Sequence, residues 1–219
     1  MAASATAQSA TSAAKAALRQ RVRARLRGLE EAEIVRQSEA VCERLVCSPL
    51  YRASRTIGIF LSMPRGELRT EPILRHAFEQ GKRVYCPRVM GEGWMEMMEV
   101  RSADDALRLP LSKWKIPEPP PESPQVEPMD LDLILVPAVA LDLRRRRCGH
   151  GMGFYDRFIA RARKGGKCRA VGLGLLEQRD DDIPEESHDE LLDGVIFPDA
   201  EAAADDAASA AADAGEAKA

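Results

Sequence analysis

The stretch LDLILVPAVALDLRRRRCGHGMGFYDRFI, residues 131–159, decides the fold of this chain. Leu133–Val136 is continuously apolar and β-prone, which predicts a strand covered on both faces. Arg144–Arg147 then concentrate positive charge beyond that strand, and three alternating glycines free the backbone to turn. From about Gly153 onward the apolar residues fall at helical spacing, which predicts that a helix begins there.

A strand, a glycine loop and a helix N-terminus together predict an anion-binding turn. Unpaired backbone amides and the helix dipole both point at such a loop, so it favours phosphate. The spacing Gly-His-Gly-Met-Gly differs from the dinucleotide fingerprint and from the P-loop. On spacing alone, a glycine-rich connection that holds no ligand therefore remains an alternative.

Further strands and helices are predicted on both sides of this stretch. We expect strands at 55–61, 83–89, 95–100, 169–175 and 194–197, and helices at 15–29, at 31–46 and from Thr70 onward. This order predicts one α/β domain over residues 15–199, with a mostly parallel sheet covered on both faces. Residues 1–14 are expected to form a disordered leader, and residues 200–219 a disordered Ala/Asp-rich tail.

Composition limits the classes of function. The chain has 219 residues, a formal net charge of −3 and five scattered cysteines without a Cys-x-x-Cys pair. The charge argues against general nucleic-acid binding, and no apolar run reaches the ~20 residues needed to cross a bilayer. The cysteine pattern is typical of a reducing compartment and offers no structural zinc site. We expect a cytoplasmic monomer that acts on a small molecule, without nucleic-acid or membrane partners.

The N-terminal region is basic and contains no acid before Glu30. Such a segment resembles an organellar transit peptide, so mitochondrial or plastid import is an alternative to the cytoplasm. We favour a genuine helix, because Leu18 and Val22 belong to an apolar stripe suited to docking on a core. Lys15 and Arg19 are four residues apart on one face of this helix and can reach one anionic ligand.

Other candidate ligand residues follow predicted elements. Met63 and Glu67 lie beyond the carboxyl end of a strand, where open α/β sheets usually build their sites. Trp114 stands on a proline-rich segment and either covers the core or offers a platform for a ring-shaped ligand. The pair His188-Asp189 is compatible with a catalytic dyad, a metal-binding carboxylate or an ordinary turn.

The glycine loop with its flanks, RCGHGMGFYD at 147–156, resembles the signature of the 5-formyltetrahydrofolate cyclo-ligase family, which is close to RLGRGxGYYD. Other landmarks occur in the family's order. They are KAALR at 15–19, IFLSM at 59–63, ELRT at 67–70, WKIP at 114–117 and the segment from Pro184 through His188-Asp189 to Asp193. The resemblance covers about residues 14–199.

This resemblance implies a three-layer α/β/α fold and the conversion of 5-formyltetrahydrofolate, with or without a polyglutamate tail, to 5,10-methenyltetrahydrofolate. ATP would phosphorylate the formyl oxygen with the help of Mg²⁺, and ADP and phosphate would leave. The resemblance implies catalytic roles for Arg147, His150 and Tyr155, and Mg²⁺ binding by Asp156 and Asp189. The implied ATP-binding residues are Lys15, Arg19, Arg147, Gly149, His150, Gly151, Met152, Gly153, Phe154 and Tyr155. The implied folate-binding residues are Met63, Glu67, Arg69, Trp114 and Tyr155.

The sequence departs from the family pattern at five positions. His150 stands where Arg is expected, Phe154 where the first Tyr is expected, and Met152 where Lys or Gly is frequent. Arg69 replaces an acidic residue expected near the folate, and Arg145 fills a turn position that is often Gly. The loop stays basic, so we expect an active enzyme.

Two other functional classes remain as alternatives. One is a folate- or nucleotide-binding regulator on the same fold, with catalysis weakened by the changes at Phe154 and Arg69. The other is an RNA-associated accessory protein that uses the basic N-terminal helix and Arg144–Arg147. The second would show salt-sensitive RNA binding, but no recognisable RNA-binding module supports it.

Overall fold

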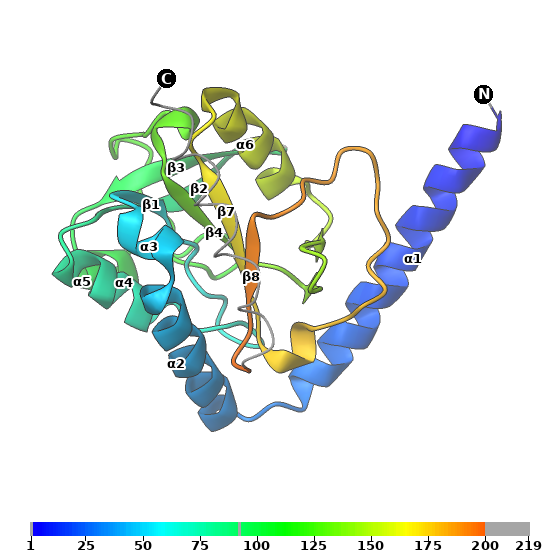
Figure 1. The fold of residues 1–219 in the computed structure, drawn as a ribbon, viewed down its shortest axis with the longest axis horizontal. Helices are drawn as coiled ribbons and strands as arrows, with labels where there is room; N and C mark the ends of the chain where they lie inside the picture. The colour runs from blue at the N-terminus through cyan, green and yellow to red at the C-terminus, as the bar shows by residue number, and fades with distance from the viewer. Residues whose placement is uncertain (1, 92, 200–219) are drawn as a thin grey trace, which may run out of the picture.

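The computed structural model of the protein describes residues 2–91 and 93–199 (Figure 1). The helices are α1 (Ala2–Arg27), α2 (Glu31–Cys47), α3 (Pro49–Ala53), α4 (Glu71–Glu79), α5 (Ala103–Leu107) and α6 (Phe154–Ala162). The strands are β1 (Thr56–Gly58), β2 (Arg83–Gly91), β3 (Trp94–Val100), β4 (Leu133–Val136), β5 (Ala140–Leu141), β6 (Arg147–Cys148), β7 (Arg169–Leu173) and β8 (Gly194–Ile196). Within these ranges, no helix combines the length and apolar character that a membrane span requires.

Six strands form one mixed sheet in the order β3-β2-β1-β4-β7-β8. All neighbouring pairs are parallel except β2 and β3, which form an antiparallel hairpin. Ile57 of β1 pairs with Leu133 of β4, and Ile134 of β4 pairs with Ala170 of β7. The predicted mostly parallel sheet is therefore confirmed, with its antiparallel strand at one edge.

The sheet is buried on both faces, as the apolar run of β4 predicts. Leu133 and Leu135 pack with residues of α2, α3 and α4, whereas Ile134 and Val136 pack with Phe158 and other residues of α6. Successive side chains of a strand point to opposite faces, so one four-residue apolar run supplies both cores. The chain is thus a three-layer α/β/α domain.

Helix α1 lies across the carboxyl ends of the strands and closes that end of the domain (Figure 1). Leu18 and Val22 are fully buried and pack with Val139, Ala140 and other residues of a third core cluster. Two-residue strands β5 and β6 form a small antiparallel hairpin beneath the helix. This hairpin carries the basic run to the glycine loop, so the predicted simple loop contains a short ribbon.

Two predicted boundaries differ from the structure by more than two residues, and the ends of other strands shift by one or two. The expected disordered leader, residues 1–14, falls within α1 from Ala2 onward, while the expected tail at 200–219 lies outside the described residues. The strand expected at 55–61 ends at Gly58, and the chain continues as an extended segment toward Met63. Arg145, where the family often has Gly, adopts a left-handed conformation with φ 67°, which explains why Gly suits that position.

Candidate active site

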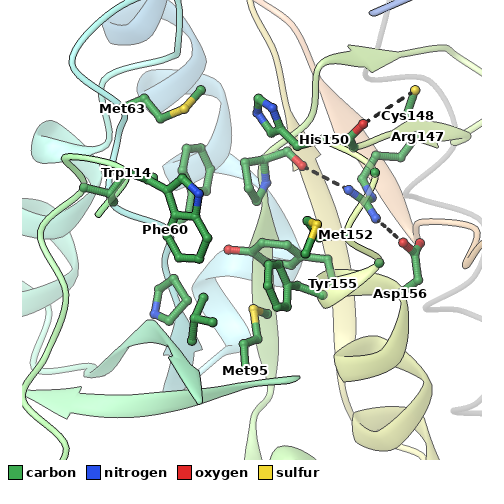
Figure 2. A pocket seen from close by; sticks show the side chains of 18 of the residues that line it. Phe60, Met63, Met95, Trp114, Arg147, Cys148, His150, Met152, Tyr155 and Asp156 are labelled. Atoms are coloured by element: carbon green, nitrogen blue, oxygen red, sulfur yellow. Dashed lines mark hydrogen bonds and ion pairs between the residues drawn. The ribbon is translucent and has the colours of Figure 1, made fainter. Parts of the chain in front are cut away.

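A cavity of about 630 Å³ opens beside the carboxyl ends of β1 and β4 (Figure 2). Its wall combines α1, the segment after β1, the proline-rich segment around Trp114, the glycine loop and the segment before β8. These segments are far apart in the sequence, and the sheet brings them to one edge. That position is the usual one for a ligand site in an open α/β fold.

The structure brings nearly all of the sequence-predicted site residues to this cavity. Those that line it are Lys15, Arg19, Met63, Glu67, Trp114, Arg147, Gly149, His150, Gly151, Met152, Gly153, Phe154, Tyr155, Asp156 and Asp189. Arg69 is the exception. Its guanidinium binds the carboxylate of Glu31 and the carbonyl oxygens of Met63 and Pro64. The expected folate contact of Arg69 is therefore replaced by a role in holding the segment that carries Met63 and Glu67.

The glycine loop lies between α1 and α6. Gly151 and Gly153 have φ values of 101° and 65°, a region that L side chains rarely occupy. Gly153 is the N-cap of α6, so the first turn of that helix faces the loop. Arg19 donates from Nε to the carbonyl oxygen of Gly149 at 2.7 Å. The loop is therefore fastened by a cation that also faces the cavity, as an anion-binding turn requires.

Arg147 and Asp156 form a buried ion pair at the base of the loop, with Nη2 and Oδ2 2.7 Å apart. Burial alone raises the pKa of Asp156, but the charge and hydrogen bonds of Arg147 lower it overall, and the backbone N–H of Glu190 also donates to this carboxylate. Among the described residues, the buried Nε of Arg147 has no hydrogen-bond partner. One donor of this guanidinium is therefore left over beside the cavity.

Lys15 is buried between two carboxylates. Its Nζ lies 2.7 Å from Oε2 of Glu186 and 2.5 Å from Oδ2 of Asp189. Burial lowers the pKa of Lys15, yet the hydrogen bonds to Asp189 and Glu186 raise it overall. Glu186, His188 and Asp189 each offer a possible metal-ligand atom within 4.8 Å of the others. Asp156 does not belong to this group, so the two predicted metal ligands are held by different cations.

The opposite side of the cavity is apolar. Phe60, Met63, Met95, Trp114 and Phe154 form this aromatic end, and Figure 2 shows Trp114, Phe60 and Met95 facing Tyr155 across the opening. The rings of Trp114 and Phe154 meet edge to face, with centroids 6.4 Å apart. The indole is 41% exposed, so Trp114 leaves an open ring surface toward a ligand. The charged end comprises Lys15, Arg19, Arg147, Asp156, Glu186 and Asp189.

Glu67 and Tyr155 lie between the two ends. Glu67 is buried and accepts the backbone N–H of Met63 at 2.6 Å. Burial raises the pKa of Glu67 to about 7, despite the opposing hydrogen bond from Met63 and the charge of Arg69. The buried Tyr155 hydroxyl has no hydrogen-bond partner in the described part of the chain. Both side chains therefore offer an unused polar atom to a ligand.

Two of the four arginines in the predicted basic run form internal ion pairs. Arg146 pairs with the buried carboxylate of Asp142 at 2.6 Å, and Arg147 pairs with Asp156. Arg144 and Arg145 alone in this run keep exposed side chains without such pairs in the described ranges. Only half of the run therefore remains available as exposed positive charge.

Sequence reasoning missed several residues of the wall. Phe60 and Met95 reach the aromatic end from strands that were predicted, but alternation alone does not reveal which strand end opens into a cavity. Glu186 lies two residues before His188, and this proximity was the only sequence feature that could have predicted it as a site residue. Arg23 was also missed, although it follows Arg19 by four residues on the same face of α1. Its Nη2 lies 3.2 Å from Nδ1 of His150.

Comparisons with known proteins agree with this geometry. The model of the 5-formyltetrahydrofolate cyclo-ligase family matches residues 11–198. A probable 5-formyltetrahydrofolate cyclo-ligase of Caenorhabditis elegans is 35% identical over 86% of this chain and 95% of its own length. The mouse 5-formyltetrahydrofolate cyclo-ligase is 32% identical over 86% of this chain and 96% of its own length.

The fold is also shared with a solved structure. The 5,10-methenyltetrahydrofolate synthetase of Aquifex aeolicus superimposes with a TM-score of 0.71 and 29% identity, over 85% of this chain and 90% of that one. The family model, which matches residues 11–198, spans the sheet, the glycine loop and the segments that form the cavity. The chain therefore belongs to the 5-formyltetrahydrofolate cyclo-ligase family.

Proposed function

We propose that this protein converts 5-formyltetrahydrofolate to 5,10-methenyltetrahydrofolate, with consumption of ATP in the presence of Mg²⁺ and release of ADP and phosphate. The observation that carries the proposal is a single cavity with an aromatic end and a cationic glycine loop. A folate is a flat ring system, and a triphosphate is a polyanion, so the two ends suit the two reactants. Membership of the family supports the same activity.

The aromatic end and its polar neighbours fit the folate. Trp114 offers an exposed ring face, and Met63 and Met95 are adaptable apolar side chains that pack against flat ligands. Glu67, with a pKa near 7, can hold a proton and donate it in a hydrogen bond to the substrate. The unpaired Tyr155 hydroxyl can bind the formyl oxygen or a neighbouring nitrogen.

The charged end fits the triphosphate of ATP. Lys15, Arg19 and the loop amides at Gly149–Gly153 supply positive charge and oriented donors, and Nε of Arg147 remains without a partner there. Bound ATP would supply the phosphoryl group that makes the formyl oxygen a leaving group. Arg147, Arg19 and the loop amides would stabilise the charge that builds up on the transferred group. The α1 helix would exclude water from it.

Carboxylates at the same end suit magnesium. Asp189 and Glu186 provide hard oxygen donors, which Mg²⁺ prefers. Asp156 has each carboxylate oxygen engaged, one by Arg147 and the other by the N–H of Glu190. We therefore assign direct or water-mediated magnesium binding to Asp189 with Glu186. Asp156 would act on the ion at longer range and would hold Arg147 in place.

The test follows the near-ultraviolet absorbance of the methenyl product after mixing the protein with 5-formyltetrahydrofolate, Mg²⁺ and ATP. We expect absorbance to grow with ATP and to stay flat without it. Parallel reactions with mono- and polyglutamylated substrate would define the preferred form. Quenching of tryptophan fluorescence by folate without any product would instead favour a binding regulator. Absence of both signals would contradict the proposal.

A further inference from the structure

His150 occupies a position where the family signature has an arginine, so the loop lacks one fixed positive charge. Its ring lines the main cavity and also a second cavity of about 610 Å³ on the α1 side. Arg23 lines only the second of these cavities and reaches His150 from behind, with Nη2 3.2 Å from Nδ1. Arg23 therefore meets the wall of the main cavity through its contact with the imidazole.

The contact between these two side chains favours one tautomer of the imidazole. A guanidinium has donors and no acceptor, so Nδ1 of His150 must accept and cannot carry a proton. The ring proton of neutral His150 then lies on Nε2, for which the described residues offer no hydrogen-bond partner. A protonated ring would set two N–H groups against each other and would break the contact.

We propose that Arg23 and His150 act as one unit that replaces the missing arginine of the glycine loop. Arg23 is a positioning residue that fixes the imidazole with its proton on Nε2, and Nε2–H donates to a phosphate oxygen of ATP. A cation bound at Nδ1 withdraws electron density from the ring and strengthens the opposite donor. The inference rests on the proposed function, because it assumes that the loop receives a triphosphate.

The electrostatic surroundings agree with a neutral ring. Desolvation in the cavity wall, followed by the charges of Arg23, Arg19 and Arg147, lowers the pKa of His150. The carboxylates of the cavity wall do not offset this, because each already has another partner. Glu67 accepts the N–H of Met63, Glu118 accepts the N–H of Val89, Glu186 and Asp189 bind Lys15, and Asp156 binds Arg147.

The first measurement is long-range ¹⁵N–¹H NMR of the full chain, which contains only three histidines. We expect His150 to carry its proton on Nε2 in the unchanged protein. The variant Arg23→Met keeps the length of the side chain but removes its donors. It should give a mixture of tautomers and a higher pKa for His150. An unchanged tautomer and an unchanged pKa would overturn the proposal.

The second measurement is the dissociation constant of ATP with Mg²⁺, followed through the His150 signals or, in variants without this histidine, by calorimetry. Arg23→Met should weaken ATP binding about tenfold and change the KM for folate less than twofold. The control is Arg144→Met, which removes an exposed arginine of the basic run at 144–147. Arg144 lines neither cavity, so this variant should change neither the dissociation constant of ATP nor the KM for folate.

A double-mutant cycle separates this unit from general charge effects. In the His150→Arg background the loop regains its own guanidinium, so Arg23→Met should change ATP affinity less than twofold or improve it, because two cations no longer repel. An equal loss in both backgrounds would overturn the proposal. Formation of the methenyl product is measured separately. If ATP binding depends on Arg23 but no product forms, the proposed function is contradicted, whereas the pairing of Arg23 with His150 is still supported.

Discussion

Two buried carboxyls of the cavity wall, Asp156 at the charged end and Glu67 between the charged and aromatic ends, have pKa values shifted in opposite directions. Asp156 is paired with Arg147, which lowers its pKa overall in spite of burial. No cation among the described residues forms an ion pair with Glu67, and burial raises its pKa to about 7. The comparison teaches that burial alone does not decide protonation. A hydrogen-bonded cation keeps one carboxyl charged, and its absence leaves the other ready to hold a proton.

The ends also differ in what holds them together. Lys15 and Arg147 are fastened by ion pairs with side chains that are mostly buried. Trp114 is held by its edge contact with Phe154 and by Lys113, whose Nζ lies 4.5 Å from the indole centroid. Removing a partner at the charged end leaves a buried charge, whereas removing one at the aromatic end leaves a solvated surface. The penalties should therefore differ in size.

The largest effect is expected at the charged end. Asp156→Ala leaves the buried guanidinium of Arg147 unpaired, so the free energy of unfolding should fall by about 3–5 kcal/mol and turnover should be lost. Urea denaturation with the methenyl assay measures both. The control is Asp104→Ala, which breaks exposed contacts with Arg75 and Arg108 and should cost ~1 kcal/mol or less. An equal loss in the free energy of unfolding for both variants would mean that burial does not set the strength of the Arg147–Asp156 ion pair.

A somewhat smaller effect is expected at Glu67, where it depends on pH. Folding raises the pKa of Glu67 from 4.5 to about 7. Protonation of Glu67 therefore stabilises the folded state fully below pH 4.5, and this contribution to the free energy of unfolding is lost as pH rises through 7. The shift corresponds to about 3 kcal/mol. Glu67→Gln keeps an acceptor for the Met63 N–H and should remove this loss.

Urea denaturation at pH 5 and pH 8 compares Glu67→Gln with the unchanged protein. The variant should gain relative stability at pH 8, by up to the full amount. Glu122→Gln, at an exposed position, serves as the control and should follow the unchanged protein. A difference between Glu67→Gln and the unchanged protein that stays constant across this range would mean that Glu67 is already charged at pH 5.

The smallest effect is expected at the aromatic end. Trp114→Ala removes one ring face from a partly exposed site, so the KM for 5-formyltetrahydrofolate should rise about tenfold, equivalent to about 1.4 kcal/mol. The KM for ATP should stay within twofold. The matched control is Trp94→Ala, because Trp94 is similarly exposed but stacks on Arg161 outside the cavity. A parallel rise in both KM values would mean that the two ends are not separate.

The sheet and most of the wall followed from sequence because their signals are local. The apolar run at Leu133–Val136, the helical spacing after Gly153 and the alternating glycines each predict their own element. Strands β5 and β6 were missed because two residues carry no periodicity. Both strands pack against α1, and local sequence does not reveal this tertiary contact.

Side-chain direction was the other limit. Arg69 was expected beside the folate, but Glu31 lies on the other side and draws the guanidinium away. The roles of Lys15 and Asp189 were predicted separately, yet nothing in the sequence indicated that they form one ion pair across 174 positions. The raised pKa of Glu67 likewise depends on its complete burial, which a sequence window around it does not reveal.

The docking of α1 has a consequence for the order of synthesis. Its buried stripe packs against Ile183, and its cations bind Asp180, Glu186 and Asp189, all of which leave the ribosome after most of the domain. At ribosomal rates, on the order of 10 s separate the emergence of the helix from that of its partners. During this interval the apolar, cationic helix lacks these partners. Helix α1 thus leaves the ribosome well before the segment that secures it.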